Sequence, residues 1–209
     1  LKNVFKTLKT KFRPGGRCII EFQQIRTREK EDQATEYNRP VHVYLVQMMM
    51  ELGYLYRTTI IWDKARLGNT VLAYGSHCSP SSPAIRDMHS YLFVFSVDDW
   101  KLECSGDPSE LDHKKYDENT KSIWRIPPET HGYGSHPCPF PIELAQRAIE
   151  IYSYRNDIIV DCFAGSGTVA VAAIRSGRKF VSIDLSQTFC AEAKQRIQHE
   201  MNKNENKAA

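Results

Sequence analysis

The feature that most constrains this sequence is a glycine-rich turn between a predicted strand and a predicted helix. Ile158–Asp161 is a short apolar run typical of a strand, and the turn that follows contains Gly165 and Gly167. A helix is predicted over Gly167–Ser176, and Lys179–Asp184 has the pattern of a second strand. A strand, a crossover helix and a second strand form a βαβ unit with parallel strands. The last third of the chain is therefore predicted to be α/β.

The glycine turn has the spacing of a nucleotide-binding site. Gly165-x-Gly167-x-x-Ala170 matches the G-x-G-x-x-G/A fingerprint, in which glycines let the backbone turn tightly and approach a ligand. Asp184 lies 19 residues after Gly165, at the end of the next predicted strand, where a carboxylate can accept hydrogen bonds from both ribose hydroxyls. No Gly-Lys-Ser/Thr follows, so the turn is not a P-loop. We therefore expect a nucleoside-containing cofactor.

The charge of Asp161 indicates which kind of cofactor. This residue ends the strand directly before the glycines, where a dinucleotide would place its pyrophosphate. A carboxylate repels that anion but attracts an ammonium or sulfonium cation. S-adenosylmethionine meets both requirements, with adenosine near Asp184 and the charged methionine end near Asp161. A nicotinamide-binding domain stays an alternative, although a full dinucleotide fold needs two mononucleotide-binding halves.

Several segments resemble the amino-methylating DNA methyltransferases. DCFAGSGT (161–168) is similar to the D-P-F-x-G-S-G-T cofactor motif of that family, with Cys162 in place of the usual proline. HPCPFPIEL (136–144) resembles the H-P-x-x-x-P-x-x-L stretch upstream of that motif in the circularly permuted class, whose cofactor motifs follow the catalytic motif. Weaker likenesses cover LKTKFRPGGRCIIEF (8–22), SPSSPAIRDMHSYLFVFS (79–96) and SIWRIPPE (122–129).

The resemblance implies a fold, a reaction and a set of site residues. The fold would be α/β, a class I Rossmann-like methyltransferase sheet with helices on both faces and an inserted recognition region. The reaction, used in restriction-modification, would move a methyl group from S-adenosylmethionine to an exocyclic amine of a flipped base in double-stranded DNA. The SPSSPAIRD part of that likeness (79–87) favours N4 of cytosine over N6 of adenine. The cofactor-binding residues would be Asp161, Phe163, Gly165, Ser166, Gly167, Thr168, Asp184, His136 and Pro137.

The resemblance also divides the chain into four parts. Residues 1–63 correspond to the C-terminal part of the catalytic half of the core. Residues 64–128 form the target-recognition insertion, with one core strand at 90–96. Residues 129–201 form the S-adenosylmethionine-binding half, and 202–209 a flexible tail.

Periodicity and turn residues predict further elements. We expect strands at 17–22 and 57–62, and a polar loop at 23–39. Helices are expected over about 4–12, 40–52, 141–152 and 187–201, and 98–122 is expected to be acidic and rich in turns.

One family motif is missing from this sequence. The catalytic loop reads S/D-P-P-Y/F/W and holds and stacks the flipped base. Pro127-Pro128 stands between Ile126 and Glu129, and neither Ser79–Ser81 nor Ser82–Ala84 has the second proline and the aromatic residue. Family order places the loop before residue 1. We therefore expect a truncated chain without a catalytic residue and without activity alone.

The strand that carries this loop would lie between the strands at 17–22 and 158–161. Without it, each of those two strands is expected to have an unpaired edge in place of a shared neighbour.

The net charge is only +3, but it is unevenly distributed. Residues 1–30 carry nine Lys or Arg and two Glu, whereas residues 98–118 carry eight acidic residues and three Lys. Solvated charged faces explain this pattern, and so does a basic surface for a polyanion. The candidates for DNA contacts are Arg66, Arg86, Lys121 and Arg125.

The composition is that of an ordinary globular protein, with 41% hydrophobic and 25% charged residues. No apolar run approaches the length of about 18 residues that a membrane helix needs. The six cysteines form no C-x-x-C pair and no signal peptide precedes them, which favours reduced thiols in an intracellular, DNA-associated protein without a metal site. The sequence leaves the oligomeric state open, a homodimer included. A catalytically inactive DNA-binding relative and an RNA or protein methyltransferase are further alternatives.

Overall fold

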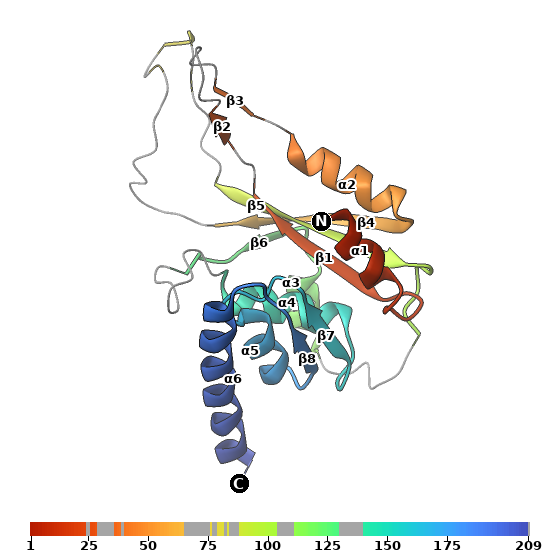
Figure 1. Cartoon of the computed structure of the whole chain (residues 1–209), viewed down its shortest axis with the longest axis vertical. Coiled ribbons are helices and arrows are strands. Elements are labelled where there is room, and N and C mark those ends of the chain that lie inside the picture. The colour runs from red at the N-terminus through yellow and green to blue at the C-terminus, as the bar shows by residue number, and fades with distance from the viewer. Residues whose placement is uncertain are drawn as a thin grey trace. The chain divides into compact units, whose positions relative to one another are not determined.

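The computed structural model describes residues 1–23, 26–28, 36–38, 40–64, 76, 79–81, 83, 88–103, 111–129 and 140–208. The chain divides into two compact units. The first comprises residues 1–103 and 122–125, and the second comprises 104–121 and 126–209. Figure 1 traces both units from the red N-terminus to the blue C-terminus.

The first unit is built on a four-stranded sheet with the order β1-β5-β4-β6. β5 (His89–Val97) is central, and β1 (Arg17–Phe22) and β4 (Tyr54–Asp63) pair with it in antiparallel fashion. β6 (Ile123–Arg125) runs parallel to β4. Because β5 has a strand on each side and is buried over most of its length, it forms a nearly continuous apolar run rather than an alternating pattern.

Two helices pack against this sheet. α1 (Lys2–Lys9) contributes Phe5 to the core, and α2 (Val41–Glu51) contributes Leu45 and Met49. They meet aromatic side chains of the strands, and the Tyr54 hydroxyl donates a 2.8 Å hydrogen bond to the Phe5 carbonyl. The lysines of α1 lie outside this core, as the helical spacing of its apolar residues predicts.

The second unit contains the predicted βαβ unit. β7 (Ile158–Asp161) and β8 (Lys179–Ser182) pair in parallel, and α5 (Thr168–Arg175) connects them. α4 (Ile142–Tyr152) and α5 cover one face of this sheet through Ala145, Ile149, Ala172 and Ala173, which pack with Ile159 and Phe180.

α6 (Gln187–Ala208) follows β8 and packs against α5. Arg175 of α5 forms a bidentate ion pair with the buried Glu200 of α6, at 2.7 and 2.9 Å.

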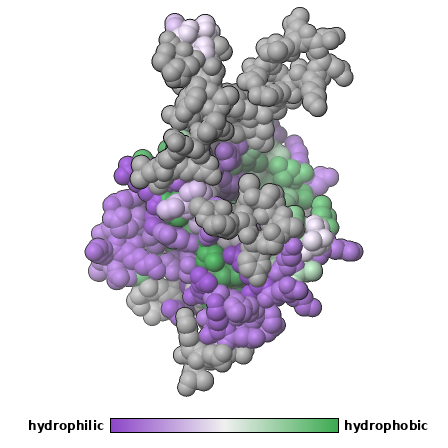
Figure 2. Space-filling model, turned by 90° about the vertical axis from the view of Figure 1, so that its left-hand side faces the viewer, coloured by the Kyte–Doolittle hydropathy of each residue, from purple (hydrophilic) through white to green (hydrophobic). Residues whose placement is uncertain are grey.

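The other face of the β7–β8 sheet is apolar and exposed. Its side chains are Ile158, Val160, Val181 and Ile183, each between 45% and 63% exposed. In the view of Figure 2, hydrophilic residues predominate among the described residues, and hydrophobic residues gather in smaller areas near the centre and toward the right-hand edge. β1 and β7 belong to different sheets, and each has an unpaired edge among the described strands.

Three predictions of secondary structure were wrong. The expected loop at 23–39 contains the antiparallel pair β2 (Arg26–Arg28) and β3 (Glu36–Asn38), strands too short to show alternation. The acidic stretch contains α3 (His113–Asn119), whose N-terminus is capped by the Asp112 carboxylate. The expected tail continues α6 to residue 208, because no glycine or proline ends the helix at 202.

Among the helices of the described residues, none combines the length and the apolar character needed to span a bilayer.

Candidate functional site

The turn between β7 and α5 is closed by its own backbone. Gly167 N–H donates to the Ala164 carbonyl at 2.8 Å, and Gly165 and Gly167 have positive φ angles of 49° and 77°. A Cβ atom at Gly167 would lie 3.1 Å from the Cβ of Ala193 in α6. Glycine is therefore required at 167 both for the backbone conformation and for the close approach of α6.

Asp184 joins the turn to the segment after β8. One carboxylate oxygen accepts from Gly165 N–H at 2.8 Å, and the other accepts from Ser186 N–H at 2.9 Å. The side chain is half-buried, and a carboxylate offers about four acceptor positions. Asp184 can therefore support the turn and still accept hydrogen bonds from a ligand.

Asp161 places a second carboxylate at the same turn. It accepts a 3.0 Å hydrogen bond from Phe163 N–H. Burial raises the pKa of Asp161, and the negative charge of Asp184 raises this pKa further. The two carboxylates are thus close enough to repel each other. A cation bound next to both of them would relieve that repulsion.

Several N–H groups of the turn are bound within the protein. Four of them donate to protein oxygens: Phe163 to Asp161, Ala164 to the Ile183 carbonyl at 3.0 Å, Gly165 to Asp184, and Gly167 to the Ala164 carbonyl. A pyrophosphate site needs N–H groups directed at the ligand. These four are already engaged, so the geometry favours a phosphate-free, cationic ligand over a dinucleotide.

The predicted cofactor residues differ in exposure. Phe163 is exposed, whereas Ser166 and Thr168 are only 2% and 4% exposed. Both of these hydroxyl groups accept hydrogen bonds from Arg196 of α6, at 3.2 and 3.1 Å. The side-chain oxygens of Ser166 and Thr168 are therefore bound within the protein. The predicted residues His136 and Pro137 lie outside the described residues.

Two residues at this turn were missed by the sequence analysis. Leu185 directly follows Asp184 and is fully exposed, which is unusual for a leucine beside a strand end. Its position after the acidic residue could have identified it. Arg196 has no comparable signal, because it reaches the turn from a helix 28 to 30 residues further along the chain.

Of the four predicted DNA contacts, Lys121 and Arg125 lie among the described residues, and each forms an ion pair. Lys121 pairs with Glu118 and, through its hydrogen bond and charge, lowers the pKa of that exposed carboxyl. Arg125 lies 3.3 Å from Asp63 and remains 79% exposed. Arg66 and Arg86 lie outside the described residues.

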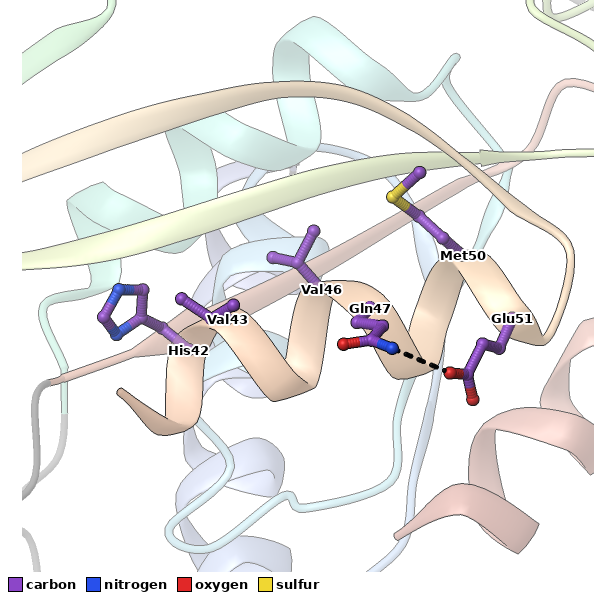
Figure 3. A pocket seen from close by; sticks show the side chains of 6 residues that line it. All are labelled: His42, Val43, Val46, Gln47, Met50 and Glu51. Carbon is purple, nitrogen blue, oxygen red and sulfur yellow. Dashed lines mark hydrogen bonds between the residues drawn. The ribbon is translucent and has the colours of Figure 1, made fainter. Parts of the chain in front are cut away.

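A shallow hollow on α2 is a poorer candidate. It measures about 440 Å³, and Figure 3 shows that its lining residues His42, Val43, Val46, Gln47, Met50 and Glu51 all come from one helix. Gln47 donates to Glu51 at 3.2 Å, and Lys2 also pairs with Glu51. Engaged polar groups on the outer surface of a single helix do not form a reactive site.

Thiol and metal chemistry are not indicated at the turn. Cys162 carries a free thiol whose pKa is raised by burial and by Asp161, so it stays protonated at neutral pH. Among the described residues, no group of three His, Cys, Asp or Glu could hold a metal ion.

The chain is similar to known DNA methylases. A family model described as DNA methylase matches residues 1–195. The type II methyltransferase M.SmaI of Serratia marcescens is 31% identical over 156 residues, which cover 69% of this chain and 47% of that protein. This chain therefore spans about half the length of that relative.

Solved structures show the same fold. The protein TTHA0409 of Thermus thermophilus, crystallised with S-adenosyl-L-methionine, matches 95% of this chain and 75% of its own with a TM-score of 0.78 and 24% identity. The PvuII DNA methyltransferase, described as cytosine-N4-specific, matches 95% of this chain and 73% of its own with a TM-score of 0.66 and 18% identity. The predicted α/β, Rossmann-like methyltransferase fold is confirmed.

We expect Asp161→Asn to raise the melting temperature of the unliganded protein near neutral pH. Burial raises the pKa of Asp161, so the folded state binds this proton more tightly than the unfolded state does. The ionised carboxylate therefore lowers stability above the raised pKa, and this effect vanishes below about pH 4, the pKa of an unfolded aspartate. The asparagine oxygen can still accept from Phe163 N–H. Thermal unfolding from about pH 3 to about pH 8 measures the difference.

Asp112→Asn is the matched control for this experiment. It removes an exposed carboxylate that caps α3, and asparagine caps a helix about as well. We expect no pH-dependent gain from it. A lower melting temperature for Asp161→Asn near neutral pH would show that burial is not the dominant effect on this carboxylate.

Proposed function

Because the chain belongs to the DNA methylase family, we propose that it transfers, or forms part of a protein that transfers, a methyl group from S-adenosylmethionine to an exocyclic amine of a DNA base. The observation that carries this proposal is the glycine turn with two carboxylates and internally engaged N–H groups. Such a turn suits a nucleoside with a cationic side chain. The match of the family model to residues 1–195 supports DNA as the partner.

The proposed cofactor position follows from the exposed groups of the turn. Asp184 would accept from the ribose hydroxyls while it keeps its two backbone donors, since a carboxylate has acceptor positions for both. Asp161 would face the ammonium or sulfonium group at the methionine end of the cofactor. His136 and Pro137 would border the same end. The exposed side chains of Phe163 and Leu185 would provide apolar contacts for the ligand. Gly165 and Gly167, which have no side chains, would leave room for the ligand. Ser166 and Thr168 would contact the ligand through backbone atoms.

For the target base, we favour N4 of cytosine, with N6 of adenine as the alternative. Two observations support this order. The SPSSPAIRD stretch (79–87) resembles the cytosine subset, and one structural relative is described as cytosine-N4-specific. Mass analysis of nucleosides from methylated DNA distinguishes the two products.

We predict that Asp184→Ala weakens binding of S-adenosylhomocysteine by about 1.5–3 kcal/mol, the effect of losing hydrogen bonds to a charged group. Isothermal titration calorimetry measures it. Asp184 also holds Gly165 and Ser186, so the variant alone does not isolate the ribose contact. The 2′-deoxy analogue of the ligand does, because its loss of affinity should be large in the unmodified protein and small in Asp184→Ala.

Two results would contradict this assignment. One is an equal effect of the 2′-deoxy change in both proteins, which would place the ribose elsewhere. The other is thermal stabilisation by NAD that exceeds stabilisation by S-adenosylmethionine, which would favour a nicotinamide-binding domain.

We predict that Lys121→Gln and Arg125→Gln each weaken DNA binding and reduce the slope of log K against log salt by about one. Their partners Glu118 and Asp63 compete with phosphate for these cations, and both ion pairs are exposed enough to exchange. Fluorescence anisotropy at several salt concentrations measures the slope. Lys194→Gln, an exposed position on α6, is the control with the same charge change. An equal slope for all three variants would place the DNA surface elsewhere.

We predict that the 209-residue chain alone shows no methyl transfer, because no S/D-P-P-aromatic tetrapeptide is present in it. Transfer of tritium from labelled S-adenosylmethionine to DNA measures the activity, with M.SmaI as the active standard. Turnover by the chain would show that other residues perform the catalysis. Cofactor and DNA binding without turnover is also the behaviour of the second candidate, a catalytically inactive DNA-binding relative.

A further inference from the structure

The glycine turn is held from behind by α6. One guanidinium nitrogen of Arg196 donates to the Ser166 carbonyl at 3.1 Å, to the Ser166 hydroxyl at 3.2 Å and to the Thr168 hydroxyl at 3.1 Å. All three acceptors belong to Ser166 and Thr168, the residues on either side of Gly167. Ser166 and Thr168 are almost completely buried, so these hydrogen bonds are shielded from water.

The same face of α6 makes the closest apolar approach to the turn. Ala193 and Ile197 are the side chains nearest to a Cβ placed on Gly167, at 3.1 and 3.5 Å. Arg196 and Ile197 lie three and four residues after Ala193, so both are neighbours of Ala193 on the helix surface. The packing brings α6 close, and the guanidinium of Arg196 binds a carbonyl of the turn.

The peptide between Ser166 and Gly167 is fixed at both of its polar atoms. Its carbonyl accepts from Arg196, and its N–H donates to the Ala164 carbonyl. Two residues with positive φ flank Ser166, and glycine offers little steric resistance to a rotation of this peptide. The contact with Arg196 therefore adds a second hydrogen bond to a peptide whose N–H is already bound, and so further stabilises one orientation of it.

A cation at this position needs an explanation. Arg196 contacts Thr168, the first residue of α5, and the N-terminus of a helix carries partial positive charge. The helix dipole therefore disfavours the guanidinium. Hydrogen bonds to one carbonyl and two hydroxyl oxygens of the turn offset that repulsion.

We propose that Arg196 is a positioning residue for the cofactor. It acts through the Ser166–Gly167 peptide, which it holds in the orientation that keeps the carbonyl on the α6 side of the turn and leaves the opposite side to the ligand. The inference rests on the proposed function for the identity of the ligand, S-adenosylmethionine or S-adenosylhomocysteine. The holding of the turn can be measured without any ligand.

The test compares Arg196→Met with Arg175→Met in the full chain. Methionine keeps much of the length of arginine and removes its donors. Arg175 also connects α5 to α6, through Glu200, so its variant controls for weaker docking of the two helices. The first measurement is amide hydrogen exchange at Gly165 and Gly167 by NMR. We expect exchange about tenfold faster in Arg196→Met, and no selective change at these two amides in Arg175→Met.

The second measurement is binding of S-adenosylhomocysteine by calorimetry. We expect the Kd to rise about tenfold in Arg196→Met and to change less than about twofold in Arg175→Met. Arg196→Lys should fall between the unmodified protein and Arg196→Met, because one ammonium can donate to the same three acceptors. If Arg196→Met does not fold, both measurements are made on Arg196→Lys and compared with those on Arg175→Met.

Unchanged exchange at both glycines would overturn the proposal, and so would an equal rise in Kd for Arg175→Met. Faster exchange without any effect on the Kd would overturn the positioning role. Failure of the unmodified protein to bind S-adenosylhomocysteine would instead contradict the proposed function, and the exchange measurement would still decide whether Arg196 holds the turn.

Discussion

The hydrogen bond from Gly165 N–H to the Asp184 carboxylate is the contact on which the site depends. It joins the end of β7 to the end of β8 at a point where the β-sheet pairing has stopped. The same carboxylate accepts from Ser186, directly before α6 begins, so one side chain orients the turn and the helix that packs behind it. Each later feature of the site, including the Ala193 contact and the arginine, requires α6 to start there.

The site uses charge in a way that opposes folding. Burial and the negative charge of Asp184 disfavour the ionised form of Asp161 and raise its pKa. A protein that needed only a tight turn would gain stability from a neutral residue here. Retention of a carboxylate at 161 is understandable if a positive ligand group completes the site, and such strain at functional positions is a common compromise.

The sequence predicted the local features of the fold better than the distant ones. The strands at 17–22 and 158–161, the helix that follows the glycines and the acidic residue after the second strand depend on short-range periodicity and spacing. The inward orientation of Ser166 and Thr168 could not be predicted in this way. It depends on Arg196, which is distant in sequence and whose local surroundings are those of an ordinary amphipathic helix.

The contact between α6 and the turn restricts which amino-acid substitutions this site can accept during evolution. Ser166, Thr168, Ala193 and Arg196 form one packed unit, in which a larger residue at 193 would collide with Gly167 and a shorter one at 196 would leave buried oxygens without donors. Substitutions at these four positions should therefore be tolerated only in compensating combinations. Homologous chains are expected to vary at them together, and a cofactor loop transplanted from one such protein to another should work only when its α6 partner residues travel with it.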